Sequence, residues 1–341
     1  MTRLGPGGVL LLWTGGLVLL VLSVAVAITF GPADIAVGDV AAVVASRLGG
    51  GETALTPIRE GIIWDLRLPR TLLAAVCGAG LGVCGAVLQS LLRNPLADPF
   101  LLGVSSGAST GAVLVVVLGV GGGAVSLSAG AFAGALCSFA CVLLLGYASG
   151  GTTDRLVLSG VAAMQLFSAL TSFIVISSAD AEQTRGVLFW LLGSLSGASW
   201  TDVSLGAAAL GAVLLVAVHT ATALDAFAFG SDAAASLGVS VARVRLLLLT
   251  ATALLTAVLV SVAGAIGFVG LVLPHAVRAL VGSGHRRLLP TTALAGAVFL
   301  VWVDTVARTA MDPQEIPVGV VTSLVGVPAF AVVLYRGRKG T

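Results

Sequence analysis

Residues 67–109 read RLPRTLLAAVCGAGLGVCGAVLQSLLRNPLADPFLLGVSSGAS and hold the pattern that decides the fold. No residue in 71–92 is charged. A helix of about 20 such residues crosses about 30 Å of hydrocarbon with every backbone group bonded inside the segment. Pro95 stops this helix, and Asp98 before Pro99 is typical of the start of another. The stretch therefore predicts two membrane-spanning helices joined by a tight hairpin.

The composition of the whole chain agrees with this reading. Of its 341 residues, 58% are hydrophobic and 9% are charged, and the mean hydropathy is +1.12. These values lie outside the range of soluble domains, so we expect an all-α polytopic membrane protein. Breaking the chain at polar, proline and glycine clusters predicts about ten spans in one transmembrane domain of residues 1–341. The spans are expected near 8–30, 68–92, 100–119, 124–147, 155–178, 200–220, 244–264, 267–282, 289–308 and 316–335.

The basic residues favour an orientation with both termini in the cytoplasm, because cytoplasmic loops carry an excess of Lys and Arg. Eleven would then lie at inner loops and span ends: Arg3, Arg93, Arg155, Arg243, Arg245, Arg278, Arg286, Arg287, Arg336, Arg338 and Lys339. Six would lie outside: Arg47, Arg59, Arg67, Arg70, Arg185 and Arg308. The net charge of +2 is too small to suggest a nucleic-acid partner.

The spans carry glycines at four-residue spacing. Examples are Gly78 and Gly82, Gly103, Gly107 and Gly111, and Gly130 and Gly134. Such spacing lets helices approach backbone to backbone, so it predicts a tightly packed bundle.

One short pattern has a chemical alternative. Residues 103–107, GVSSG, fit the G-x-S-x-G turn of a hydrolase, with His275 and Asp304 as the only candidate partners of Ser105. That turn needs a strand leading into it, whereas an apolar helical run surrounds this one. We therefore expect no nucleophile here. The sequence also lacks G-x-x-x-x-G-K-[ST], so the chain is not expected to hydrolyse ATP or to be an enzyme.

Three longer stretches resemble one protein family. Residues 67–109, together with GAIGFVGLVLPHAVRALVGSGHRRLLP (264–290) and DTVARTAMDPQEIPVGVVTSLVGVPAF (304–330), look like the iron-siderophore, haem and cobalamin permeases of ABC importers (FecCD-like and BtuC-like). The resemblance runs from about residue 8 to the C-terminus. It implies the type II importer permease fold, with ten spans per subunit, in a bacterial cytoplasmic (inner) membrane.

The resemblance also implies the partners. A second permease copy or a paralogue would complete the pore, and an extracytoplasmic substrate-binding protein would deliver the cargo. Two cytoplasmic ATP-binding subunits would use ATP and Mg. The chain itself would bind membrane lipid and no cofactor.

Outer arginines are the first predicted site. In the family, arginines matching Arg67, Arg70 and Arg308 pair with carboxylates of the binding protein, a use that suits the bidentate guanidinium. The alternatives are contact with lipid phosphate or a local pair with Asp65 and Asp304.

The inner loop 225–241 is the second predicted site. We expect Ser231 to cap a short helix, Asp232 to favour its positive end, and Gly238 to close it in the left-handed conformation. In the family this segment contacts the ATPase, which implies coupling residues Ser231, Asp232, Ala233, Ala234, Ala235, Ser236, Leu237 and Gly238. An ordinary loop helix would have the same sequence features.

The resemblance places the cargo pathway along the fifth and tenth spans. Weakly polar residues share one face of each of these helices: Gln165, Ser168 and Ser172, and Gly319, Thr322, Ser323 and Gly326. Hydrogen bonds between helices and close packing would explain the same residues equally well. The cytoplasmic gate candidates are Asn94, Leu96, Thr152 and Thr153.

His275 follows Pro274 inside a span and has no helical spacing to His219 or His285. A metal site needs three or four converging donors, so we expect a packing or kink role and no protein-bound metal. Proline in a span frees a carbonyl, which a neighbouring group can satisfy.

Two further alternatives concern function. A secondary transporter is disfavoured, because coupling to protons or sodium needs carboxylates near mid-membrane and the acidic residues here fall in loops or near span ends. The cargo is expected to be an iron-siderophore complex, the commonest in the family. Haem and cobalamin are the alternatives.

Overall fold

The computed structural model describes residues 6–51, 53–178, 180–311 and 313–337, and within them all regular structure is helical. Seven of these helices are long and apolar enough to cross a membrane. They are α1 (Pro6–Thr29), α4 (Leu68–Leu91), α6 (Leu127–Ala148), α7 (Thr153–Ser178), α9 (Trp200–His219), α12 (Val241–Ala263) and α14 (His285–Thr309). Three shorter helices are apolar over 13 or 14 residues: α5 (Val104–Val116), α13 (Val269–Val281) and α15 (Val318–Gly337). Each predicted span overlaps one of these ten helices, and the protein is a multi-pass membrane protein.

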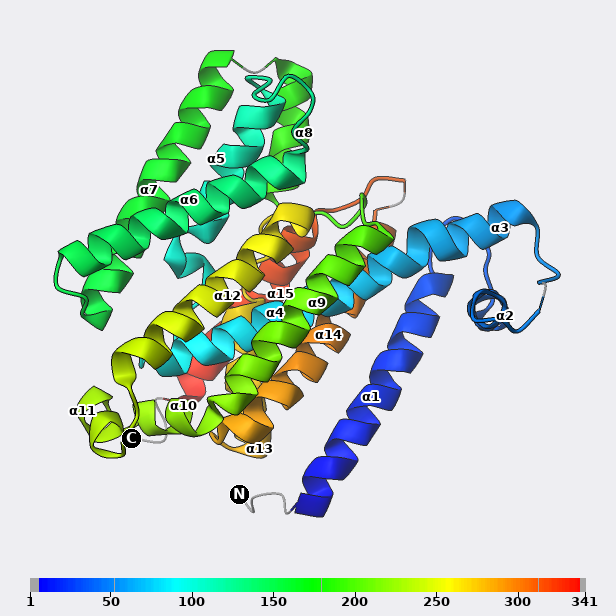
Figure 1. Cartoon of the computed structure of the whole chain (residues 1–341). Coiled ribbons are helices and arrows are strands. Elements are labelled where there is room, and N and C mark those ends of the chain that lie inside the picture. Colours follow the sequence, from blue (N-terminus) through cyan, green and yellow to red (C-terminus); the bar gives the residue numbers. More distant parts are fainter. Residues whose placement is uncertain (1–5, 52, 179, 312, 338–341) are drawn as a thin grey trace.

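Short helices fill several connections. They are α2 (Val37–Arg47), α3 (Pro57–Gly61), the π-helix η1 (Ile62–Arg67), the 3₁₀ helix η2 (Pro99–Leu102), α8 (Ala181–Leu191), α10 (Ala221–Phe227) and α11 (Ser231–Ser236). Helices α3, η1 and α4 run on without a break, so the second span extends well beyond the bundle (Figure 1). Sequence analysis did not predict α2 or α8.

Helix α4 forms the centre of the structure. It is buried along nearly its whole length and contacts α9, α12, α13 and α14 (Figure 1). Helices α5, α6 and α7 pack on one another and reach the centre through α12, whereas α1 packs mainly on α14.

Glycine makes this central position possible. A Cβ atom on Gly78 would overlap the carbonyl oxygen of Gly296 in α14, and one on Gly85 would overlap that of Gly270 in α13. Gly107 and Gly134 stand in the same relation where α5 crosses α6. The predicted backbone-to-backbone packing is therefore confirmed.

In the hairpin after α4, the next helix starts where the sequence predicts, and α4 itself ends at Leu91, before Pro95. The Asp98 carboxylate accepts from the Phe100 N–H at 2.9 Å, with Pro99 in the first turn of η2, as predicted. At the end of α4 the left-handed residue is Arg93 (φ 49°). The turn closes through the Asn94 N–H, which donates to the Gln89 carbonyl at 3.1 Å.

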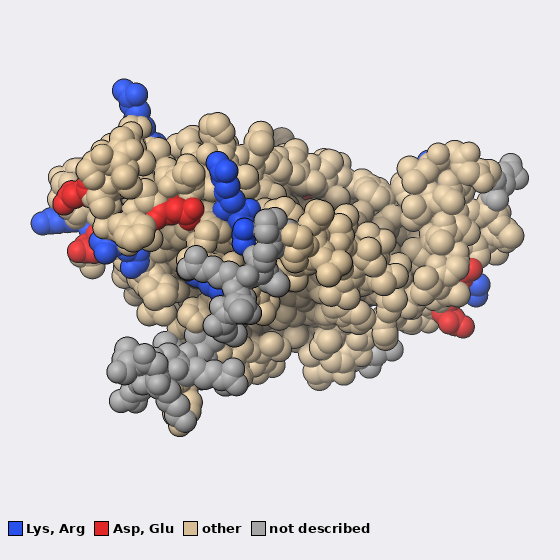
Figure 2. Space-filling model, turned by 90° about the horizontal axis from the view of Figure 1, so that it is seen from below, with Lys and Arg blue, Asp and Glu red and all other residues tan. Residues whose placement is uncertain are grey.

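The two ends of the bundle differ in what they carry. One end, here called the α11 face, holds α10, α11, the α4–η2 hairpin and the α13–α14 loop. The opposite end, the α2 face, holds α2, α3 and α8 (Figure 1). In the view from below, more of the Arg side chains lie at one side of the molecule, with a few acidic groups among them, and a smaller group of charges lies at the other (Figure 2).

Backbone hydrogen bonds join three connections on the α2-face side. The Ser194 N–H donates to the Ala263 carbonyl at 2.9 Å, and the Val318 N–H donates to the Gly193 carbonyl at 2.9 Å. Non-helical backbone at membrane depth is stable only where protein satisfies it. This junction fixes the ends of α8, α12 and α15 against one another.

Candidate functional site

The predicted docking arginines lie at the α2 face, but their guanidinium groups are bonded within the chain. Arg70 grips the buried Asp304 carboxylate with Nε at 3.0 Å and Nη2 at 2.9 Å, and it reaches Glu315 with Nη1 at 2.8 Å. Arg308 stands 3.6 Å from the same aspartate. The local pair with Asp304 that we gave as an alternative is thus present, and docking stays a prediction.

Arg67 and Arg308 hold the end of α1. Arg67 Nη1 donates to the Ile28 carbonyl at 2.8 Å, and its Nη2 donates to the Ala33 carbonyl at 3.0 Å. Arg308 donates to the carbonyls of Phe30, at 2.7 Å, and Ala27. The last carbonyls of a helix have no partner inside it, so these two side chains cap α1. No ion pair joins either arginine to Asp65 among the described residues, so that part of the alternative is wrong.

The predicted coupling helix is present as α11, but its cap differs. Gly230 (φ 104°) precedes the helix, so Ser231 is its first residue rather than its cap. The Ser231 hydroxyl instead accepts from Arg245 Nη2 at 3.0 Å, which ties α11 to α12. Gly238 is left-handed (φ 85°), as expected. Of the coupling residues, Ala234 is fully buried, Ser231 and Ala233 are half-buried, and the other five are exposed: Asp232, Ala235, Ser236, Leu237 and Gly238.

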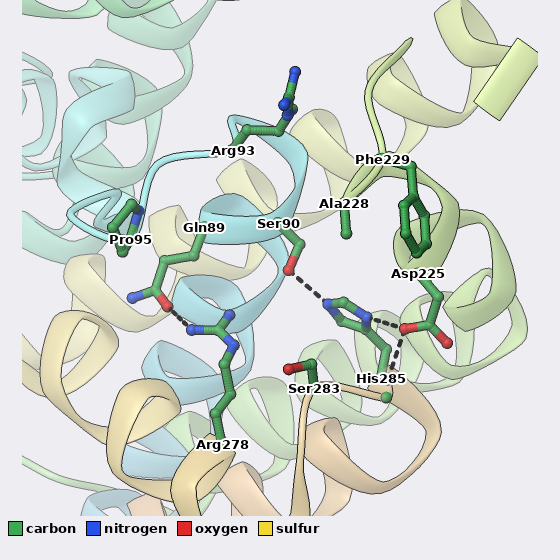
Figure 3. Close-up of a pocket in the computed structure, with 11 residues that line it drawn as sticks. Gln89, Ser90, Arg93, Pro95, Asp225, Ala228, Phe229, Arg278, Ser283 and His285 are labelled. Atoms are coloured by element: carbon green, nitrogen blue, oxygen red, sulfur yellow. Dashed lines mark hydrogen bonds and ion pairs between the residues drawn. The ribbon is translucent and has the colours of Figure 1, made fainter. Parts of the chain in front are cut away.

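A pocket of about 570 Å³ opens on the α11 face beside this helix (Figure 3). Three of its side chains form a chain of hydrogen bonds. Ser90 Oγ lies 2.6 Å from His285 Nε2, and His285 Nδ1 lies 2.5 Å from Asp225 Oδ1. The same carboxylate oxygen accepts from the His285 backbone N–H at 3.0 Å. These contacts connect α4, α14 and α10.

This order of groups is that of a Ser-His-Asp triad, but its setting does not suit acyl transfer. A triad needs N–H donors aimed at the developing oxyanion. Ser90 lies in the last turn of α4, where the helix end presents carbonyl oxygens and the negative end of the macrodipole. Its hydroxyl also lies 3.1 Å from the Ala86 carbonyl. We therefore assign the three residues a bracing role. The other triad considered above is not assembled, because Asp304 is bonded to Arg70.

A second polar group from α4 reaches into α13. Pro274 has no N–H, so the Gly270 carbonyl one turn earlier loses its helical donor. Gln89 Nε2 donates to that carbonyl at 3.1 Å, and Arg278 donates to Gln89 Oε1 (Figure 3). The expected satisfaction of a proline-freed carbonyl is confirmed, and Gln89 is the donor. His275 itself is exposed.

A cavity of about 410 Å³ lies between α5 and α7, and hydroxyl groups line it. Two predicted pathway residues, Ser168 and Ser172, lie there, and Gln165 is exposed on the same helix. Sequence analysis missed the facing hydroxyls of α5 and one more from α7: Ser105, Ser106, Ser109 and Thr171. The four-residue spacing of Ser105 and Ser109 was a signal for a polar helix face.

The predicted stripe on α15 faces the protein instead. Thr322 is fully buried and donates to the Gly319 carbonyl at 3.0 Å. A Cβ on Gly319 would overlap the Leu192 carbonyl, and one on Gly326 would meet Phe268. Ser323, which is half-buried, also bonds to the Gly319 carbonyl. Close packing explains these four residues, and a pathway along α15 stays a prediction.

The gate candidates lie at two loops of the α11 face. Asn94 Oδ1 accepts from the Leu96 N–H at 2.9 Å, and Leu96 is half exposed. Thr152 Oγ1 stands 3.4 Å from the Arg155 N–H at the start of α7, whose first residue is Thr153. Each loop is shaped by its own polar side chains, and gating stays a prediction.

Metal ligands do not converge in the part of the chain that the structure describes. No group of three or more His, Cys, Asp or Glu side chains there could hold a metal ion. The cysteines Cys77 and Cys84 are buried in α4 as free thiols.

Comparison with known proteins gives one family. The model of the FecCD transport family matches residues 19–336. The cobalamin import system permease protein BtuC of Halobacterium salinarum is 43% identical over 82% of this chain and 74% of its own. The iron(3+)-hydroxamate import system permease protein FhuB of Bacillus subtilis is 36% identical over 98% of this chain and 85% of its own. The hemin transport system permease protein HmuU of Yersinia pestis is 39% identical over 81% of this chain and 84% of its own.

A solved structure has the same architecture. A metal-chelate type ABC transporter in an inward-facing conformation matches 95% of this chain and 98% of its own, with a TM-score of 0.83 and 32% identity. The all-helical permease fold expected from the sequence is therefore confirmed.

Proposed function

The chain belongs to the FecCD transport family and is the permease of an ABC importer, and from this premise we propose that its cargo is an iron-siderophore complex. Permeases of this family work with ATPase subunits and a partner permease. The energy for transport then comes from hydrolysis of ATP, which the two cytoplasmic ATPase subunits bind together with Mg. The chain contributes the path, the coupling surface and half of the pore.

The hydroxyl-lined cavity between α5 and α7 is the observation that supports this cargo. The Ser106 and Ser109 hydroxyls donate to helix carbonyls. The Thr171 hydroxyl donates to the Phe167 carbonyl and lies 2.9 Å from that of Thr110. No described residue in the lining is charged. Neutral, weakly polar walls suit a chelate whose metal is already wrapped, because such a cargo must pass without being held tightly.

The same lining argues against haem. Haem carries carboxylates on its edge, and a carboxylate leaving water needs a cation or several donors. Cobalamin is the second candidate, since its corrin ring carries neutral amides and the relative that is 43% identical is a cobalamin import permease.

The orientation follows from the proposed partners. We place the α11 face in the bacterial cytoplasm, with α11 seated on an ATPase subunit, and the α2 face toward the extracytoplasmic binding protein. The arginines Arg93, Arg155, Arg243, Arg245, Arg278, Arg286 and Arg287 all lie at α11-face loops or helix ends, in keeping with the excess of basic residues at cytoplasmic loops.

The docking proposal needs an exchange of partners. Arg70 Nη1 is held by Glu315, whose side chain is 36% exposed, whereas the contacts with Asp304 are buried. A carboxylate of the binding protein can replace Glu315 on Arg70 without disturbing Asp304. Arg67 and Arg308 then support the platform by capping α1.

Uptake by cells lacking the gene tests the cargo. Labelled ferric hydroxamate, labelled cobalamin and labelled haem are supplied with and without a complementing copy. We expect the copy to restore ferric hydroxamate uptake. Restoration of cobalamin uptake alone would identify cobalamin as the cargo of the same importer. Restoration of haem uptake alone would contradict the inference that the neutral cavity lining disfavours haem.

A further inference from the structure

The pocket on the α11 face contains two arginines without a carboxylate partner. Arg278 donates to Gln89 Oε1, and its other N–H groups have no partner among the described residues. The Arg93 side chain makes no hydrogen bond or ion pair with any residue that the structure describes. Asp225, the one acidic residue in the described lining, already accepts twice from His285. The pocket therefore has more positive charge than its own residues neutralise.

The Arg278 side chain is held in place, whereas Arg93 is exposed and only its backbone position is defined. Arg93 adopts a left-handed backbone conformation (φ 49°), which is uncommon for residues other than glycine and sets its Cα at the end of α4. Arg278 is held by Gln89, which is itself bonded to the backbone of α13. The Arg278 guanidinium therefore loses little entropy on binding, and both guanidinium groups can form strong hydrogen bonds with a carboxylate.

The remaining walls are apolar and continuous with the coupling segment. Ala228 and Phe229 line the pocket between α10 and α11, and the Phe229 side chain is 78% exposed. Pro95 lines the opposite side (Figure 3). A protein seated on α11 would cover this opening, and the pocket offers it a cationic wall beside an apolar one.

We propose that the pocket is a second docking site for the ATPase subunit, which inserts an acidic side chain between Arg93 and Arg278 with an apolar neighbour against Phe229. This inference rests on the proposed seating of the ATPase on α11 and extends it. The pocket contacts other helices than α11 does. Arg278 is bonded to Gln89 of α4, which is bonded in turn to the backbone of α13. The hydrogen-bonded side chains of Ser90, His285 and Asp225 connect α4, α14 and α10 in the pocket wall.

Charge reversal in the pocket tests the proposal. The permease is placed in nanodiscs of neutral phosphatidylcholine, and the Kd of the ATPase subunit is measured. Ser283→Glu adds a competing carboxylate at an exposed loop position, and Arg93→Glu reverses an exposed charge, so neither change alters a buried contact. We expect each to raise Kd about tenfold or more, as for loss of a close charge pair at an interface.

Two control variants separate the possible results. Arg155→Glu makes the same change in charge on the α11 face but outside the pocket lining, and we expect at most about a twofold effect, as for a peripheral charge. Ala235→Arg places a bulky cation on the exposed side of α11. If Ala235→Arg weakens binding while the pocket variants bind like the wild type, the pocket proposal fails and the coupling role of α11 stands. If the pocket variants weaken binding while Ala235→Arg binds like the wild type, the coupling role of α11 is rejected and the docking role of the pocket stands.

Two other results would also overturn the proposal. An Arg155→Glu effect as large as that of Arg93→Glu would mean that general attraction between the surfaces explains the binding. In parallel nanodiscs that also contain phosphatidylglycerol, loss of this lipid from Arg93→Glu, with an unchanged Kd for the ATPase, would assign the arginines to an anionic lipid.

Discussion

Gln89 in α4 donates a hydrogen bond to the Gly270 carbonyl, which Pro274 leaves without a helical partner, at 3.1 Å. One buried side chain thereby compensates for a proline in the neighbouring helix. The bond also places Gln89 Oε1 where Arg278 can donate to it. A defect in the backbone of α13 is thus converted into a fixed contact between α4 and α13.

Replacing Gln89 with leucine is expected to destabilise the protein by about 1–3 kcal/mol, because a buried carbonyl would be left without a donor. Thermal unfolding of the purified permease in detergent measures the loss. Gln165→Leu is the matched control, since Gln165 is exposed and its side chain makes no hydrogen bond among the described residues. Equal melting temperatures for the two variants would contradict the role of Gln89.

Gly85→Ala is expected to destabilise the protein by about 1–3 kcal/mol or more, because its methyl group would overlap the Gly270 carbonyl and force α4 away from α13. Gly211→Ala in α9 is the control, because nothing lies within 4 Å of its added Cβ. That variant should gain up to about 1 kcal/mol from better helix propensity. The two unfolding curves should therefore shift in opposite directions, and shifts in the same direction would contradict the packing argument.

Ser168→Phe is expected to lower cargo uptake on the order of tenfold, because the ring would fill much of the hydroxyl-lined cavity. Assembly with the ATPase should stay unchanged, as shown by co-purification. Ser204→Phe adds the same ring to an exposed position on α9 and should leave uptake as in the wild type. Normal uptake by Ser168→Phe would remove this cavity from the pathway.

Glu315→Gln is expected to tighten binding of the extracytoplasmic binding protein several-fold, because it removes the carboxylate that competes for Arg70 Nη1. The Kd between the purified permease and the purified binding protein measures the change. Glu182→Gln removes an exposed acidic group from α8 on the same face and serves as control. Weaker binding by Glu315→Gln would mean that Glu315 itself contacts the partner.

The buried carboxyl group of Asp98 makes the stability of the folded protein depend on pH. Burial raises the pKa of its carboxyl group to about 6, although the Phe100 N–H bonded to it favours the charged form. The folded protein therefore binds this proton more tightly than the unfolded chain does. Its contribution to stability is full below about pH 4 and is lost as pH rises through about 6. The melting temperature of the wild type relative to Asp98→Asn should fall over that range, and a constant difference would contradict the assignment.

The span positions could be predicted because each depends on a local property, the length of an apolar run. The short helix α8 was missed although Asp180 and Gln183 form a capping box at its start, which is a local signal. Its other end is fixed by backbone bonds from the distant start of α15, which the sequence does not reveal. The same limit applies at the cap of α11: Ser231 has the right residue type, but its hydroxyl is taken by Arg245, fourteen positions along the chain.

The site residues also divide into those that the sequence could identify and those that it could not. Arg70 and Asp304 were both named from the sequence, but across 234 positions their local pairing could be given only as the alternative to docking. Ser90, His285 and Asp225 had no signal, because each is an isolated polar residue at the end of an element. Only the packing of α4, α10 and α14 brings them together.

The capping of α1 has a consequence for how the chain is made. Helix α1 is synthesised well before α14, which holds it: Trp13 donates to Thr291 at 3.0 Å, Trp302 donates to Ser23 at 3.1 Å, and Arg308 donates to Phe30 at 2.7 Å. Until synthesis has passed residue 308, α1 waits in the bilayer with its terminal carbonyls only partly satisfied. A nascent chain arrested before residue 285 should therefore keep α1 open to protease and quality control, and release of the full chain should close it.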